Sequence, residues 1–244
     1  MPDHSPGHSP AIAAGIAELV RGCRHLAAVG FVTSHGGNLS LRLDADTVLI
    51  TPTQVAKADV GPEDICVIGM DGRVRFAAPG RRPTGEWPFH VAILAQRPDL
   101  RGLVHAHPPA ITGLAIAHSD LLARPLLPEP IIEVGPVLPV PYAVPLSDDL
   151  AGAFTPVLPL SNAFLMLNHG ILLGNALGAW RAVELLDMLE AAAHSAVIAH
   201  QLGTVRSLTR AEVDALEQVM LARGLPMPGL PTPGRRLADL YFPN

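Results

Sequence analysis

The chain has 244 residues, a length that corresponds to one large domain or at most two small ones. Hydrophobic residues make up 49% of it and charged residues 16%, so a sizeable core can form and wholesale disorder is excluded. The formal net charge of −5 argues against a nucleic-acid partner and against a polybasic membrane surface.

The compartment is predicted from cysteine usage and from the absence of apolar runs. Cys23 and Cys66 show no C-x-x-C spacing, so we expect no disulfide framework and a reducing, cytoplasmic location. Residues 1–10 are polar and Pro-rich, which predicts a flexible tail rather than a signal peptide. No run approaches the ~20 apolar residues that span a bilayer, so we expect no membrane partner.

The first elements are one helix and three strands. Apolar residues at helical spacing predict a helix over 11–29, ended by Gly30. Gly36 and Gly37 indicate a turn. Three strands follow, the last two joined by an Asp-Gly turn typical of a hairpin: 47–51, 64–69 and 73–77.

The second half alternates strands with helices. A helix is predicted over 86–96 with Thr84 as a candidate N-cap, a short buried strand over 102–105, and a helix opened by Pro108-Pro109. The Pro-rich stretch 134–143 indicates an edge strand or a loop. The remaining predictions are two strands, two helices and a Pro-rich C-terminal tail: 163–167, 170–174, 176–202, 209–223 and 225–244. We therefore expect an α/β fold of the α+β type, with a central, mostly antiparallel sheet flanked by helices over residues 11–224.

Two histidines end a predicted strand. His105 and His107 are two positions apart, so strand alternation places both imidazoles on one face. Two such ligands are half of a tetrahedral zinc site, although two buried, hydrogen-bonded histidines would give the same pattern.

A third histidine and a glutamate extend the candidate metal site. His169 lies between two predicted strands, at a position able to face the first pair, and could otherwise be a turn residue. Glu86 opens a predicted helix, where a carboxylate ordinarily compensates the helix dipole. Three histidines and one glutamate are together a ligand set for zinc, and a carboxylate ligand can also act as a base.

Three short turns are rich in N–H and hydroxyl donors. Such turns can cradle a phosphate, although most turns of this kind in isolation are only turns. They are Gly36-Gly37-Asn38, Thr51-Pro52-Thr53 and Pro83-Thr84-Gly85.

Five segments, in this order, resemble the class II aldolase/adducin family, and most of all its L-fuculose-1-phosphate aldolase branch. They are GGNLSLR (36–42), ITPT (50–53), PTGEWPFH (83–90), VHAHP (104–108) and LNHGILLGN (167–175). The resemblance runs from about residue 11 to 220. It implies a largely antiparallel sheet covered by helices, usually assembled as a homotetramer with sites at subunit boundaries.

The resemblance also implies residue roles. His105, His107 and His169 would bind Zn²⁺, with Mn²⁺ or Co²⁺ as substitutes, and Glu86 would be both the fourth ligand and the acid/base. The implied substrate-binding residues are Gly37, Asn38, Thr53, Gln54, Thr84 and Gly85. Tyr241 is a further candidate, because C-terminal aromatics of the family reach a neighbouring site.

Three features depart from the aldolase branch. Gln54 stands where the branch has Gly, Thr84-Gly85 where it has Ser-Ser, and no tyrosine occurs at 127–130, near the position of the branch's proton-donor tyrosine. The first two changes fall in the turns that would bind the substrate phosphate.

The leading hypothesis is a zinc-dependent aldolase, a C–C lyase that cleaves a ketose phosphate to dihydroxyacetone phosphate and an aldehyde through a metal-bound ene-diolate. A metal-dependent decarboxylase of a keto-acid, phosphorylated or not, is the alternative that the departures favour. A non-catalytic, metal-stabilised binding module is the second alternative.

Overall fold

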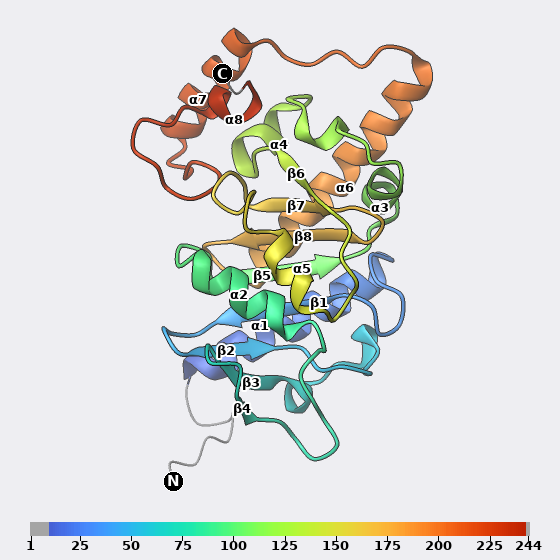
Figure 1. The fold of residues 1–244 in the computed structure, drawn as a ribbon, viewed down its shortest axis with the longest axis vertical. Coiled ribbons are helices and arrows are strands. Elements are labelled where there is room, and N and C mark those ends of the chain that lie inside the picture. The colour runs from blue at the N-terminus through green and yellow to red at the C-terminus, as the bar shows by residue number, and fades with distance from the viewer. Residues whose placement is uncertain (1–9, 243–244) are drawn as a thin grey trace. The chain divides into compact units, whose positions relative to one another are not determined.

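The structure, a computed structural model, describes residues 10–242. The chain folds into two compact units, drawn in Figure 1. Unit 1 comprises the residues up to His107 together with Ala143–Gly152 and Leu173–Glu184. Unit 2 comprises Pro108–Tyr142, Ala153–Leu172 and the residues from Leu185 onward. The predicted tail over 1–10 lies outside the described residues, except for its last position.

Unit 1 is built on antiparallel strands. Its strand order is β4-β3-β2-β1-β5-β8, and the pairs β1–β2, β1–β5, β2–β3 and β3–β4 are antiparallel. The strands are β1 (Asn38–Arg42), β2 (Thr47–Ile50), β3 (Cys66–Gly69), β4 (Val74–Phe76), β5 (Gly102–Ala106) and β8 (Gly170–Asn175). The Asp-Gly hairpin is confirmed, since Gly72 takes the positive φ of 78° that the turn between β3 and β4 needs.

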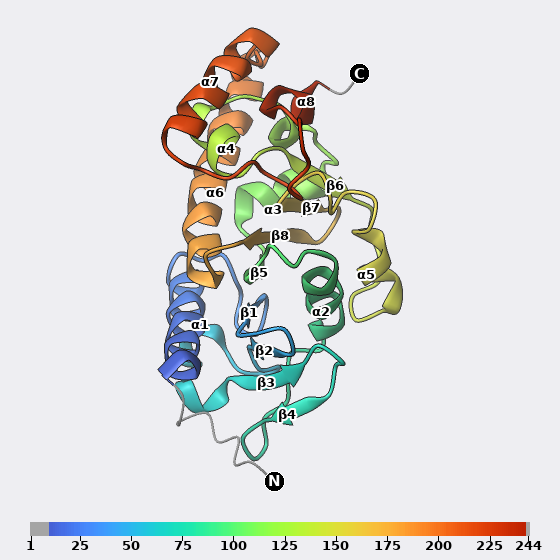
Figure 2. The same cartoon turned by 90° about the vertical axis from the view of Figure 1, so that its left-hand side faces the viewer.

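Two helices cover opposite faces of the unit 1 strands: α1 (Pro10–Ala28) on one side and α2 (Trp87–Gln96) on the other (Figure 2). Helix α1 comes very close to the sheet, because a Cβ at Gly22 would lie only 2.6 Å from a Leu39 methyl carbon. Helix α2 buries Phe89, His90, Ile93 and Leu94. Three further elements complete the unit: η1 (Lys57–Asp59), η2 (Pro62–Asp64) and most of α5 (Asp148–Ala153).

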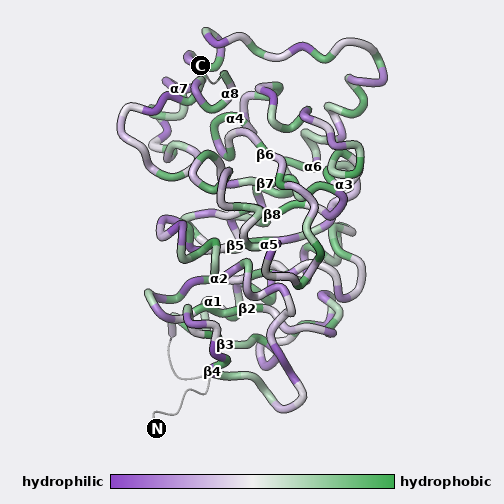
Figure 3. Tube along the Cα trace, viewed as in Figure 1, coloured by the Kyte–Doolittle hydropathy of each residue, from purple (hydrophilic) through white to green (hydrophobic). Residues whose placement is uncertain are grey.

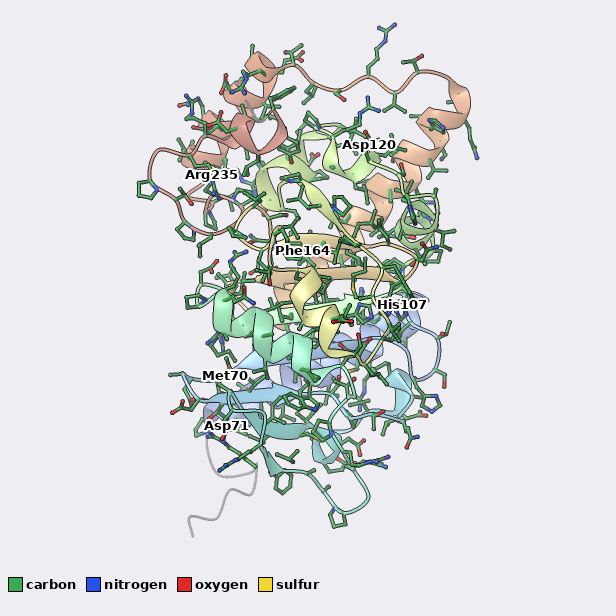
Figure 4. The ribbon with its side chains drawn as sticks, in the orientation of Figure 1. Met70, Asp71, His107, Asp120, Phe164 and Arg235 are labelled. Atoms are coloured by element: carbon green, nitrogen blue, oxygen red, sulfur yellow. The ribbon has the colours of Figure 1, made fainter. Side chains whose placement is uncertain are left out.

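Unit 2 contains the strand order β8-β7-β6, where β8 contributes residues to both units. Strands β7 (Ala163–Met166) and β6 (Val137–Val140) pair in parallel, and β6 is the edge strand that the prolines predicted. Figure 3 shows hydrophobic residues along β7 and β8. Phe164 on β7 meets Phe154 edge-on, with ring centroids 5.7 Å apart (Figure 4).

The helical elements of unit 2 are α3 (Pro109–Ile116), η3 (Leu121–Ala123), α4 (Pro128–Glu133), the larger part of α6 (Ala179–Leu202), α7 (Arg210–Ala222) and α8 (Leu237–Tyr241). Helices α4, α7 and α8 share an apolar cluster, formed by Ile131, Ile132, Val213, Met220, Leu237 and Ala238. Helix α8 lies within the segment predicted as a C-terminal tail, and Arg235 just before it donates to the Pro159 carbonyl at 2.9 Å (Figure 4).

The predicted fold class is confirmed, since helices flank a central, mostly antiparallel sheet of eight strands within residues 10–242. In that part of the chain, no helix combines the length and the apolarity that a bilayer crossing requires.

Candidate active site

His105 and His107 lie at the end of β5. His105 is fully buried, and the two rings meet edge-on with centroids 4.8 Å apart. The His107 amide donates to the Phe31 carbonyl at 2.8 Å, so the backbone just after β5 is held against the loop that follows α1. Figure 4 labels His107. Strand alternation thus brings both imidazoles to one point, as their spacing predicts.

Gly37 allows the loop before β1 to pass over this strand end. Its φ is +68°, and a Cβ there would come 2.7 Å from the His105 carbonyl oxygen. Only glycine fits both conditions. The next residue, Asn38, starts β1 directly opposite His105 in the antiparallel register.

The Glu86 side chain lies beside both Asn38 and His105. It is the N-cap residue of α2, and its side chain is only 11% exposed. Its Oε2 accepts a hydrogen bond from Asn38 Nδ2 at 2.7 Å and lies 3.6 Å from His105 Nε2. Thr84 is therefore not the N-cap; its hydroxyl instead accepts from the Glu86 amide at 3.4 Å.

The third predicted ligand lies in the tight turn between β7 and β8. The turn is closed by the His169 amide, which donates to the Met166 carbonyl at 3.0 Å, and Asn168 takes a positive φ of 55°. One ring nitrogen from each of His105, His107 and His169 lies within 4.8 Å of the others. Imidazole nitrogens beside a carboxylate are donors that zinc and related divalent ions accept, so the residues present fit such an ion.

The predicted phosphate donors lie on two paired segments of unit 1. The Thr53 amide donates to the Arg82 carbonyl at 2.9 Å, and the Thr84 amide donates to the Thr51 carbonyl at 2.9 Å. Gln54 takes the left-handed φ of 60°, a conformation that glycine adopts without strain. The neighbouring Gly85 has a Leu146 methyl carbon 2.8 Å from where its Cβ would be.

Three contributors to this region were not predicted. Lys57 is 1% exposed and donates to the His35 carbonyl at 3.1 Å; burial lowers its pKa, and the interaction with Glu86 opposes that shift. His90 is hydrogen-bonded to Asn38, and Ser40 is hydrogen-bonded to His90. Sequence spacing could have indicated the last two residues. His90 follows Glu86 by one helical turn, and Ser40 follows Asn38 on the same face of the strand.

Tyr241 packs inside unit 2. It lines a cavity of about 350 Å³, which is mostly aliphatic and includes Leu127, Ile131 and Leu189. Burial raises the pKa of its hydroxyl. Its predicted role at a neighbouring site therefore stays a prediction.

Comparison with known proteins decides the family. The family described as Class II Aldolase and Adducin N-terminal domain matches residues 17–197, about three quarters of the chain. The chain belongs to this class II aldolase family. The resemblance predicted from five sequence segments is thus confirmed.

Two relatives that are similar to this chain are named for different activities. The 3-oxo-tetronate 4-phosphate decarboxylase of Haemophilus influenzae is 30% identical over 145 residues, which cover 58% of this chain and 68% of the relative. The 5-methylthioribulose-1-phosphate/5-deoxyribulose-1-phosphate aldolase of Rhodospirillum rubrum is 40% identical over 108 residues, 44% of this chain and 45% of the relative. The second match thus spans less than half of that aldolase.

A solved class II aldolase structure, an L-fuculose 1-phosphate aldolase, has a TM-score of 0.77 at 26% identity. The match covers 89% of this chain and 99% of that one. The family generally depends on a divalent metal, which the histidine cluster could hold.

Proposed function

We propose that the protein is a zinc-dependent aldolase that cleaves a ketose phosphate to dihydroxyacetone phosphate and an aldehyde. The observation that carries this proposal is the Glu86 carboxylate, held by the Asn38 amide at 2.7 Å and placed 3.6 Å from His105 Nε2. His105, His107, His169 and Glu86 would hold the ion. When bound, Zn²⁺ supplies a Lewis acid that polarises the substrate carbonyl.

Glu86 is the proposed acid/base of the reaction. Its side chain is mostly buried and accepts a hydrogen bond from Asn38, so the carboxylate is held in one direction instead of turning in solvent. A carboxylate positioned in this way can remove a proton from the carbon next to a carbonyl, or return it.

The substrate phosphate is proposed to bind the paired turns of unit 1. Donors there include the backbone amide of Gly85 and the hydroxyl groups of Thr53 and Thr84. Gln54 adds a side-chain amide at a left-handed position of the same turn. The remaining predicted contacts, Gly37 and Asn38, start the neighbouring strand β1.

A decarboxylase of a phosphorylated keto-acid is the second candidate. Gln54 in place of the aldolase branch's glycine changes the phosphate cradle, and α4 (Pro128–Glu133) carries no tyrosine where that branch has its proton donor. A relative named as such a decarboxylase aligns over 68% of its own length. The same carboxylate could serve this reaction by protonating the carbon that loses CO₂.

One product assay separates the two candidates. Zinc-loaded protein is incubated with several ketose 1-phosphates and several phosphorylated keto-acids, and dihydroxyacetone phosphate and CO₂ are measured. Aldol cleavage supports the leading proposal, whereas CO₂ release alone supports the second. If zinc-loaded protein gives neither product, both proposals fail and a metal-stabilised binding module remains.

Glu86→Gln tests the assigned acid/base directly. We expect kcat to fall by about 10²–10⁴-fold because the amide cannot take up the proton, while the thermal unfolding midpoint stays near that of the wild type. Glu63→Gln, an exposed substitution on η2, is the matched control and should leave kcat unchanged. Wild-type turnover in Glu86→Gln would remove Glu86 from the mechanism.

The cytoplasmic homotetramer implied by the resemblance is also a proposal. Light scattering of the purified chain would give a mass near four chains if it is right, and a monomer mass would contradict it.

A further inference from the structure

A continuous line of buried hydrogen bonds runs to the Glu86 carboxylate within unit 1. Ser40 Oγ lies 2.7 Å from His90 Nδ1, and His90 Nε2 lies 2.5 Å from Asn38 Oδ1. Asn38 Nδ2 then donates to Glu86 Oε2 at 2.7 Å. Ser40 and His90 are fully buried and Asn38 is 2% exposed, so these contacts are made out of water.

The Glu86 carboxylate at the end of this line determines which atoms along it carry hydrogens. An ionised Glu86 can only accept, so Asn38 must present its NH₂ group there and its carbonyl oxygen to His90. That oxygen also accepts only, so His90 must carry its hydrogen on Nε2. A neutral His90 then accepts at Nδ1 from the Ser40 hydroxyl, and every member has a partner of opposite character.

The other histidine tautomer would break the line. With the hydrogen on Nδ1, the Nε2 lone pair would face the carbonyl oxygen of Asn38. The amide would have to turn over to donate to His90, and its oxygen would then face the carboxylate of Glu86. Two acceptors held together without water are costly, so His90 and Asn38 fix one another's orientation.

Packing holds the His90 ring in this direction. The ring stacks on the neighbouring Phe89 with centroids 4.5 Å apart and planes 22° apart. Phe89 in turn meets the His105 ring edge-on at 5.9 Å. Since Asn38 lies opposite His105 in the strand register, the group that orients Glu86 is anchored beside a predicted metal ligand.

We propose that His90 is a positioning residue that fixes the Asn38 amide and thereby directs the Glu86 carboxylate toward the metal ligands. His90 acts through Asn38 and touches neither substrate nor metal. The inference rests on the proposed function only for the catalytic role of Glu86; the orientation itself is a property of the folded chain.

Two substitutions at one position test the role. His90→Leu removes the donor, whereas His90→Gln offers an amide N–H near the place of Nε2. We expect His90→Leu to weaken zinc affinity and kcat by about 10–100-fold, as for other residues that orient a metal ligand, and His90→Gln to recover most of both. If glutamine loses as much as leucine does, or if folded His90→Leu equals the wild type, the proposal is overturned.

A third measurement needs no substitution and no turnover. Long-range ¹H–¹⁵N correlation NMR of the metal-free wild-type chain reports which nitrogen of His90 carries the hydrogen. A protonated Nε2 supports the proposal, and a protonated Nδ1 overturns it. If no lyase activity is found, the proposed function fails, yet zinc affinity and the tautomer still decide the role of His90.

Discussion

At Gly37 the backbone of the loop before β1 passes very close to the end of β5, beside the candidate site. A Cβ at this position would lie 2.6 Å from a Val32 methyl carbon and 2.7 Å from the His105 carbonyl oxygen. We expect Gly37→Ala to lower the free energy of unfolding by about 2–4 kcal/mol, through left-handed strain and overlap together, as measured by urea denaturation.

Gly30 provides the matched control for that substitution. Its φ of +76° is nearly the same as that of Gly37, but among residues 10–242 no atom beyond its two chain neighbours lies within 4 Å of the place of its Cβ. Gly30→Ala should therefore cost only the backbone strain, about 1–2 kcal/mol. Equal costs at the two positions would show that the close approach to β5 contributes nothing.

Sequence periodicity predicts neighbours within one element and fails between elements. The closeness of His105 and His107 follows from strand alternation alone. The contact of Asn38 with Glu86 requires the register of β1 on β5 and the docking of α2, which no local pattern contains. The hydrogen bonds of His90 were not predicted for the same reason, because its partners Ser40 and Asn38 lie on another element.

At the scale of elements, the long helices and most of the short strands lie where the sequence predicts them, and a few short elements were not predicted. Helix α1 has a clear apolar face at the 3.6-residue period, and α6 is marked by a largely apolar run of 24 residues that is too long for a strand. Strand β1 was missed because the two glycines before it dominate the pattern, and α4 because prolines occupy two of its six positions. The parallel pairing of β6 with β7 depends on the path between them, which sequence alternation does not encode.

One contact between helices of unit 2 gives a test at this scale. Glu190 of α6 is 4% exposed and caps α3, accepting from the amides of Ala110 at 2.7 Å and Ile111 at 2.9 Å. Glu190→Ala leaves the buried amide of Ile111 and the part-buried amide of Ala110 without this partner. We expect the free energy of unfolding to fall by about 2–4 kcal/mol in urea denaturation.

Glu190→Gln separates the cap from simple packing. Glutamine keeps the shape and one acceptor oxygen, so its cost should be clearly smaller than that of alanine. Hydrogen exchange at the two amides should speed up most in the alanine variant. If the two variants lose the same stability, the carboxylate is not acting as a helix cap.

At the scale of the whole molecule, a buried neutral imidazole makes stability depend on pH. Burial foremost, and then the charge of His105, lowers the pKa of His90 from its usual 6.5 to about 3. Between these values the unfolded chain binds a proton that the native chain does not bind. The free energy of unfolding must therefore fall as the pH falls from about 6.5 toward about 3, by as much as ~1.4 kcal/mol per pH unit from this group.

His90→Gln isolates that contribution, because the other titrating groups are common to both chains. Urea unfolding of the metal-free proteins at pH 7, 6 and 5 should give the wild type the steeper loss of stability, with a difference approaching one proton per molecule. Identical slopes would mean that native His90 takes up its proton like an exposed histidine. The neutral ring that orients Asn38 at neutral pH is thus expected to be a source of acid lability in the metal-free fold.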